Sequence, residues 1–223
     1  MRTATSKTSM TLEQAVSQQF LLTFESRETP PKQFLDVLRR HHIGGVVLFR
    51  HKNMGALNEL RGLTMALQNA AAETGQPPLL IAADQEGGQL IAVDQTTPFP
   101  GNMALGATKS ENLANKVGRA LGKELSAVGV NVDFAPVCDV NNNPLNPVIG
   151  TRSFGEDPRL VAQMSAALIR GLQSSGVAAT AKHFPGHGDT SSDSHRGAPI
   201  VMHNAKRIRS IELVPFRAAV NSG

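Results

Sequence analysis

The sequence predicts an α/β fold of the TIM-type (β/α)8 barrel class, and three observations support this prediction. Short apolar segments typical of buried strands alternate along the chain with segments of helical periodicity. Such alternation is typical of parallel β/α units joined by right-handed connections. Polar motifs follow the ends of several of these strands, on the side where barrels hold their sites, whereas an open doubly wound sheet would place its site at one switch point. Nucleotide-binding glycine motifs are absent from the sequence.

Five strands are expected, each a short and largely apolar segment: residues 19–24, 43–49, 78–84, 130–137 and 176–183. Helices are expected after Thr11, Pro31, Asn53 and Ser110, and over about residues 158–173 and 213–220. Thr11 and Gln14 have the spacing of a capping box at the start of the first helix.

The number of strands indicates an incomplete barrel of about five β/α units, because a closed barrel needs about three more. We therefore expect residues 1–10 to be a polar leader and residues 11–223 to be the N-terminal portion of a barrel domain. The C-terminal units of that domain are expected to lie beyond Gly223.

The composition excludes several classes of protein. The net charge is +4, from 22 Lys and Arg against 18 Asp and Glu, and it forms no basic block of the kind that binds nucleic acid. No apolar segment approaches the roughly 18 residues of a membrane span, and residues 1–10 lack the apolar core of a secretion signal, so a cytoplasmic location is expected. Cys138 is the single cysteine, which we interpret as a buried apolar residue.

Reactive side chains are concentrated in the stretch from Lys182 to His195. Six of its fourteen residues are Lys, His or Asp, although charged residues make up 18% of the whole chain. They alternate with Gly, Pro and Ser, which indicates a loop that displays polar side chains at the end of the fifth strand.

Asp193 and His195 are two residues apart, so in an extended loop both side chains can point the same way. The carboxylate would then orient one imidazole nitrogen and leave the other free for proton transfer. The alternative is that both side chains hold the loop in place.

The spacing of two histidines suggests a metal site, but the residues between them argue against it. His183 and His187 have a spacing that would pair two metal ligands on a helix, but Pro185 and Gly186 oppose a helix there. A metal site in the loop, formed by Asp189, Asp193 and His195, remains an alternative. We expect neither a metal ion nor another cofactor.

Other polar residues follow the earlier strands. Asp84 begins the motif Asp-Gln-Glu-Gly-Gly at the end of the third strand, where the acids can bind a ligand or cap a polar turn. Asp139 is expected to accept hydrogen bonds from neighbouring protein groups. Arg152 lies in a glycine-flanked loop, where a ligand-binding role and a surface role are equally open.

These motifs together resemble those of bacterial β-N-acetylglucosaminidases of glycoside hydrolase family 3. The matching segments are residues 43–50, 84–88, 97–100, 135–139, 150–158 and, above all, 182–195. The resemblance extends from about residue 11 to the end of the chain. The chain departs from the family pattern in two ways. Gln89 to Ala92 follow Glu-Gly-Gly where family members often have arginine, and no residue matches the nucleophilic aspartate of the family.

The resemblance implies a retaining glycosidase that removes terminal β-linked N-acetylglucosamine from cell-wall muropeptides or related glycans. In that family pattern His195, oriented by Asp193, is the general acid/base. The residues implied to bind the sugar are Asp84, Arg152, Lys182 and His183. With the nucleophile expected beyond Gly223, these 223 residues alone are expected to be inactive, and the alternative function is a non-catalytic sugar-binding remnant or structural subunit.

Overall fold

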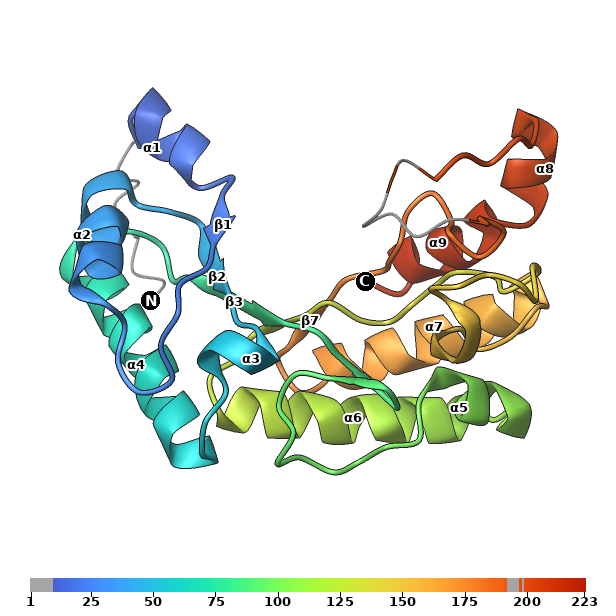
Figure 1. The fold of residues 1–223 in the computed structure, drawn as a ribbon, viewed down its shortest axis with the longest axis horizontal. Coiled ribbons are helices and arrows are strands. Elements are labelled where there is room, and N and C mark those ends of the chain that lie inside the picture. The colour runs from blue at the N-terminus through green and yellow to red at the C-terminus, as the bar shows by residue number, and fades with distance from the viewer. Residues whose placement is uncertain (1–9, 192–196, 198) are drawn as a thin grey trace, which may run out of the picture.

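The computed structural model describes residues 10–191, 197 and 199–223. Its centre is an open sheet of five parallel strands, in the order β1-β2-β3-β6-β7 (Figure 1). The strands are β1 (Leu21–Leu22), β2 (Gly45–Val47), β3 (Leu80–Ala83), β6 (Val132–Asp133) and β7 (Ala178–Ala179). Each strand pairs with the one that precedes it in this sheet, so the predicted α/β class with a parallel sheet is confirmed. The described residues form no closed barrel, and β1 and β7 are the two edges.

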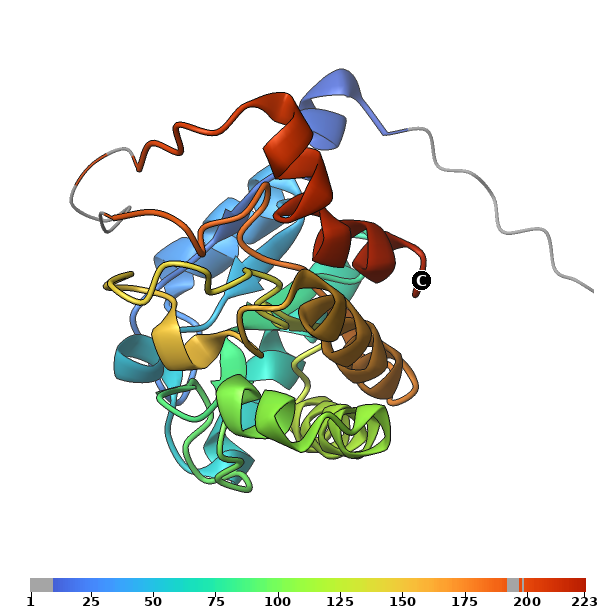
Figure 2. The same ribbon diagram turned by 90° about the vertical axis from the view of Figure 1, so that its right-hand side faces the viewer.

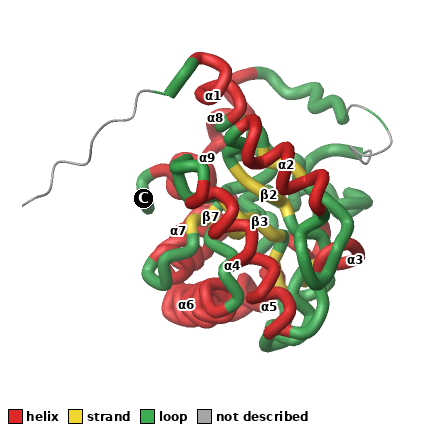
Figure 3. The backbone as a smooth tube through the Cα atoms, turned by 90° about the vertical axis from the view of Figure 1, so that its left-hand side faces the viewer, coloured by secondary structure: helices red, strands yellow, loops and turns green. Residues whose placement is uncertain are grey.

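Helices pack beside the sheet, and several that are near one another in the chain are in contact, such as α2 with α4 and α6 with α7. In Figure 3, α2 and α4 lie in front of the strands, and in Figures 1 and 2, α6 and α7 lie side by side. The helices are α1 (Leu12–Ser17), α2 (Lys32–His41), α3 (Arg50–Asn53), α4 (Leu57–Glu73), α5 (Asn102–Thr108), α6 (Glu111–Ala127), α7 (Pro158–Gln173), α8 (Ala205–Ser210) and α9 (Leu213–Val220).

The predicted helix boundaries are reproduced where a capping signal marks them. The capping box is present: the backbone N–H of Gln14 donates to Thr11 Oγ1 at 3.2 Å, and that of Thr11 donates to Gln14 Oε1 at 3.0 Å. Ser110 caps α6 by accepting from the N–H of Leu113. Side-chain caps therefore located these helix starts correctly.

The prediction that a long helix starts at Asn53 was wrong. Asn53 instead ends the short helix α3 and is fully buried. Its side chain accepts from the N–H of Phe49 and donates to the carbonyl of Phe24, which ties two loops together. The sequence analysis also missed α5, α8 and the hairpin of β4 (Gln85–Gly87) and β5 (Leu90–Ile91).

The core has two main parts that meet at the sheet. One packs α2 and α4 against β2 and β3 through fully buried residues such as Leu38, Val46 and Leu60. The other lies between α6 and α7, which approach so closely that a Cβ on Gly171 would lie 2.3 Å from the carbonyl oxygen of Asn115. That distance explains why glycine is present within the last turn of α7, although glycine is otherwise unfavourable in a helix.

Two further findings concern expectations from the composition. Within the described ranges, no helix combines the length and the apolar character needed to cross a membrane. Cys138 is completely buried, and burial raises the pKa of its thiol to about 12. It is therefore a packed core residue with little thiolate character, as the sequence predicted.

Asp133 is a carboxyl group buried inside the sheet, on β6. It has no exposed surface, its Oδ1 accepts from the N–H of Gln85, and its Oδ2 has no hydrogen-bond partner in the structure. Burial raises the pKa of Asp133 well above its ordinary value, and the hydrogen bond from Gln85 opposes this effect only in part. The protonated form is therefore favoured in the folded state.

We predict that the difference in the free energy of unfolding between Asp133→Asn and wild type shifts in favour of the variant as the pH rises. In the unfolded chain Asp133 loses its proton above about pH 4, whereas the folded state resists that loss, so wild-type stability falls with rising pH. Asparagine has no proton to lose. Urea unfolding at pH 4 and pH 7 measures the difference, with the exposed Asp36→Asn as the control. A stability difference that is the same at both pH values would contradict the prediction.

Candidate active site

Polar side chains gather at the carboxyl ends of the strands, as the sequence predicted. Asp84 follows β3 directly, Asp139 lies six residues after β6, and Lys182 lies three residues after β7. Lys182 pairs with Val137 in an isolated parallel bridge, which keeps the two loops side by side beyond the ends of their strands. Parallel strands present their carboxyl ends at one edge, so residues distant in the sequence meet there.

Glu86 is the centre of this cluster. Its side chain is 1% exposed, and its carboxylate accepts two parallel bonds from Arg152, from Nε at 2.9 Å and from a terminal nitrogen at 2.8 Å. The Lys182 ammonium lies 2.6 Å from Glu86 Oε1. A two-pronged guanidinium contact is geometrically selective, because the planar fork fits a carboxylate in one orientation.

The pKa values around Glu86 are those of a compensated buried charge. Burial alone raises the pKa of Glu86, but hydrogen bonds and charges from Arg152 and Lys182 outweigh it, and the net effect lowers the pKa. Burial alone lowers the pKa of Arg152, and Glu86 reverses that effect and raises it. Both shifts favour the charged forms of Glu86 and Arg152, so burial of either charge depends on the presence of the other.

Lys182 also binds Asp84, with 2.6 Å between its Nζ and Asp84 Oδ1. The Lys182 side chain is 13% exposed, that of Asp84 is 31% exposed, and that of Arg152 is 10% exposed. Glu86 thus contacts both cations on their buried side, while Asp84 and a small part of each cation remain accessible to solvent. Such an open mixture of donors and acceptors is suited to hydroxyl groups.

Asp139 organises the loop that carries His183. Completely buried, it accepts from the backbone N–H of His187 at 2.7 Å and from the backbone N–H of His183 at 3.2 Å. Its Oδ2 is 2.6 Å from Nδ1 of His183. Asp139 is therefore the hydrogen-bond acceptor that the sequence analysis expected, and it fixes both the loop and the imidazole ring.

The tautomer of His183 follows from its two partners. A terminal nitrogen of Arg152 lies 3.3 Å from His183 Nε2, and a guanidinium can only donate. Nε2 must therefore accept, and the ring proton is on Nδ1, where it is donated to Asp139. The second histidine, His187, is buried and contacts Thr190 through its Nδ1. The two rings have separate partners and do not share a metal-binding arrangement.

Arg152 is positioned by the loops on either side of it. It ends a 3-10 turn, Gly150–Arg152, and its carbonyl accepts from the side chain of Asn102 on α5 at 2.8 Å. Asn146 Oδ1 accepts from the N–H groups of Val148 and Ile149 at 2.9 and 2.8 Å. A surface role for Arg152 is thus excluded by its burial and its contacts.

A cleft of about 210 Å³ lies beside Asp84. Its walls come from the segment after β2 and from the β4–β5 hairpin. The polar lining residues are Arg50, His51, Asp84 and Gln89. Gln89, one of the positions at which this chain departs from the family pattern, therefore faces the space next to the cluster.

The structure brings together four of the six predicted site residues: Asp84, Arg152, Lys182 and His183. The predicted acid/base pair, Asp193 and His195, lies outside the described residues. Glu86 was missed as a site residue, although it belongs to the same Asp-Gln-Glu-Gly-Gly motif. The motif places Glu86 two residues after Asp84, but only the fold shows that Arg152 and Lys182 are buried around it.

Comparison with known proteins finds relatives along most of the chain. Residues 11–223 match the model of the glycosyl hydrolase family 3 N-terminal domain. The chain is 44% identical over 200 residues to β-hexosaminidase A of Pseudoalteromonas piscicida, covering 87% of this chain and 33% of that protein. It is 39% identical over 190 residues to the β-hexosaminidase of Nitrosomonas eutropha, covering 81% of this chain and 52% of that protein.

Solved structures show the same fold. A family 3 β-N-acetylglucosaminidase from Paenibacillus superposes with a TM-score of 0.93 at 44% identity, covering 96% of this chain and 41% of that one. NagZ from Neisseria gonorrhoeae, in complex with N-trifluoroacetyl-D-glucosamine, gives a TM-score of 0.83 at 32% identity, covering 91% and 60%. The chain thus spans about a third to a half of these curated relatives. Because the family model matches residues 11–223, the chain belongs to the glycosyl hydrolase family 3 N-terminal domain family.

Proposed function

We propose that the protein to which these residues belong hydrolyses terminal β-linked N-acetylglucosamine, as a β-N-acetylhexosaminidase. The observation that carries this proposal is the compensated cluster of Glu86, Arg152 and Lys182 at the strand ends, beside the half-buried Asp84. Membership of the family and the names of the related β-hexosaminidases support it. Cell-wall muropeptides or related glycans are the proposed substrates, and the cytoplasm is the proposed location.

The proposed roles follow from exposure and hydrogen-bonding capacity. Lys182 and Arg152 donate to sugar hydroxyl or acetamido oxygens, and Asp84 accepts from hydroxyl groups. His183 contacts the sugar on its exposed edge, since its side chain is 35% exposed and its ring is oriented by Asp139. The ligand of the Neisseria gonorrhoeae structure, an N-acylated glucosamine, is the kind of sugar that this set would hold.

We further propose a retaining mechanism in which His195, oriented by Asp193, is the general acid/base. An imidazole with an ordinary pKa near 6.5 can protonate the glycosidic oxygen and then deprotonate water. Retention requires a carboxylate nucleophile, to which no residue of this chain is assigned. The activity is therefore proposed for the protein at the length of its relatives, and these 223 residues alone are proposed to be inactive.

The proposed architecture of that protein is a (β/α)8 barrel. The sheet supports this proposal because its five strands are parallel and follow sequence order. Beside the edge strand β7 is an apolar hollow of about 580 Å³, whose lining includes Phe184, Phe216 and Val220. Phe184 is 72% exposed and Val220 is 79% exposed, which suits a surface that further β/α units would cover.

The proposed activity predicts that the full-length protein cleaves an aryl β-N-acetylglucosaminide and first releases the β-anomer. His195→Ala should lower kcat by about 10²–10⁴-fold, the usual contribution of general acid/base catalysis. Proton NMR of the product identifies the anomer. Sugar binding without turnover in the full-length protein would instead support the non-catalytic alternative, and turnover by residues 1–223 alone would contradict the proposed division of the site.

Glu86→Gln should weaken the site without unfolding the protein. The substitution keeps the shape of the side chain but removes the charge that holds Arg152 and Lys182, so both cations lose their orientation toward the sugar. We expect kcat/KM of the full-length enzyme to fall by about 10²-fold, mainly through KM. The exposed Glu28→Gln is the matched control and should behave as wild type. Equal kcat/KM values for both variants would contradict the assigned role of Glu86.

A further inference from the structure

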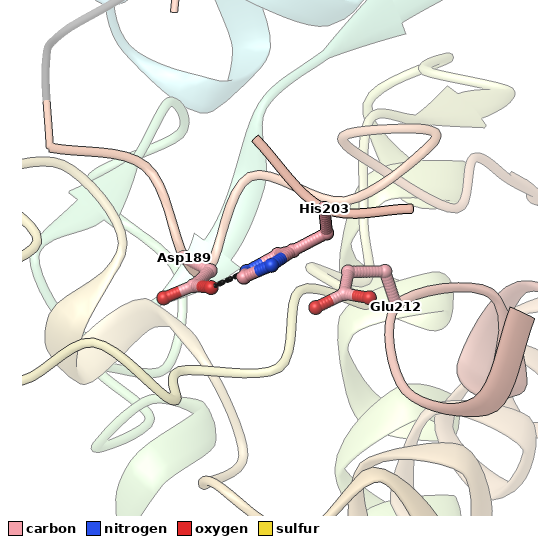
Figure 4. Close-up of side chains that lie close together, drawn as sticks. All are labelled: Asp189, His203 and Glu212. Atoms are coloured by element: carbon pink, nitrogen blue, oxygen red, sulfur yellow. Dashed lines mark hydrogen bonds and ion pairs between the residues drawn. The ribbon is translucent and has the colours of Figure 1, made fainter. Parts of the chain in front are cut away.

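A second cluster, of metal-type ligands, shares no residue with the proposed sugar-binding set. Asp189 comes from the loop after β7, His203 precedes α8, and Glu212 precedes α9. Each offers one ligand atom, and the three atoms lie within 4.8 Å of one another. Figure 4 shows the imidazole of His203 between the two carboxylates, with its Nε2 paired to Asp189 Oδ2. Three separate segments of chain therefore converge on one small volume.

Glu212 has a carboxylate oxygen that the fold leaves without a partner. The residue is 4% exposed, and its Oε1 accepts from Arg207 at 3.2 Å and from Asn142 at 3.4 Å. Its Oε2 is buried and has no hydrogen-bond partner in the structure. A buried anionic oxygen without a partner is costly, and a bound cation would compensate for it.

The ligand set indicates the class of cation. One imidazole nitrogen with two carboxylate oxygens suits zinc and similar transition metals, whereas magnesium and calcium prefer oxygen ligands throughout. Bonds of about 2.0–2.2 Å in a tetrahedral site place neighbouring ligand atoms about 3.4 Å apart. Moderate side-chain movements would therefore close the cluster around one ion, with a fourth position left for water.

Arg207 is the competing cation. One of its terminal nitrogens lies 3.2 Å from Glu212 Oε1 and 3.7 Å from Asp189 Oδ2. With neutral His203, the two carboxylates and one guanidinium leave a net charge of −1, which still favours a cation. Arg207 is half-exposed, so it can move toward solvent when an ion enters.

We propose that Asp189, His203 and Glu212 form a binding site for a divalent cation of the zinc class, which Arg207 opposes by its charge. The site would fasten the loop after β7 to the segments before α8 and α9. Gly186 shows how closely these parts already approach, since a Cβ there would lie 2.8 Å from Cβ of Glu212. Because the three ligands converge only in the folded chain, the ion would stabilise that state.

The test is a calorimetric titration of the untagged chain with ZnCl2 at pH 7, together with thermal unfolding in the presence and absence of the ion. We expect one ion to bind and to raise Tm. His203→Ala should weaken binding by about tenfold or more, since it removes a ligand. Arg207→Gln should strengthen binding severalfold, because it removes a positive charge about 4 Å or less from the ligands.

His51→Ala is the matched control, since His51 is an exposed histidine outside the cluster, and it should bind as wild type does. The opposite responses of the His203 and Arg207 variants separate this site from unspecific binding to surface histidines. The proposal is overturned if the wild-type chain binds no zinc, if His203→Ala binds as tightly as His51→Ala, or if Arg207→Gln binds no tighter than wild type. Thermal unfolding without zinc verifies that each variant is folded.

Discussion

The cluster of Asp84, Glu86, Arg152 and Lys182 depends on the buried charge of Glu86. A carboxylate with a side chain that is 1% exposed is tolerated only because Arg152 and Lys182 compensate for it, and those two residues come from separate segments of the chain. The ion pairs therefore require the β4–β5 hairpin, the 3-10 turn and the loop after β7 to be assembled together. Glu86 also fixes the two cations in place, so binding of a ligand would not have to bear the entropy cost of immobilising them.

A second buried acid, Asp139, holds the loop after β7 in position, as Glu86 holds the two cations. Its contacts are two backbone N–H groups and the ring of His183, so it determines both the path of the loop and the direction of the imidazole. The two networks meet where Arg152 donates to His183. Asp133 lies beneath them in a site that favours its protonated form, which avoids a further negative charge next to Asp84 and Glu86.

The loop after β7 is thus held at two places by different means. Asp139 binds it near the sheet, and Asp189 joins it, farther along, to His203 and Arg207. The predicted acid/base residues follow Asp189 in the sequence and lie outside the described residues. From the sequence, Asp189 was a potential metal ligand together with Asp193 and His195. Its partners in the structure, His203 and Glu212, carry no spacing signal because they come from two later segments.

The sequence by itself determined the alternation of strands and helices, most helix starts, and four residues of the candidate site. These features depend on local patterns: apolar periodicity, side-chain caps, and polar residues immediately after apolar strands. The tertiary structure decided the open sheet with β1 and β7 as edges, the position of Asn53 as a loop anchor, and the role of Glu86. Each of these depends on contacts between residues far apart in the chain. A buried ion pair such as that of Glu86 with Arg152 can be recognised only in the fold, which shows which charges are removed from water together.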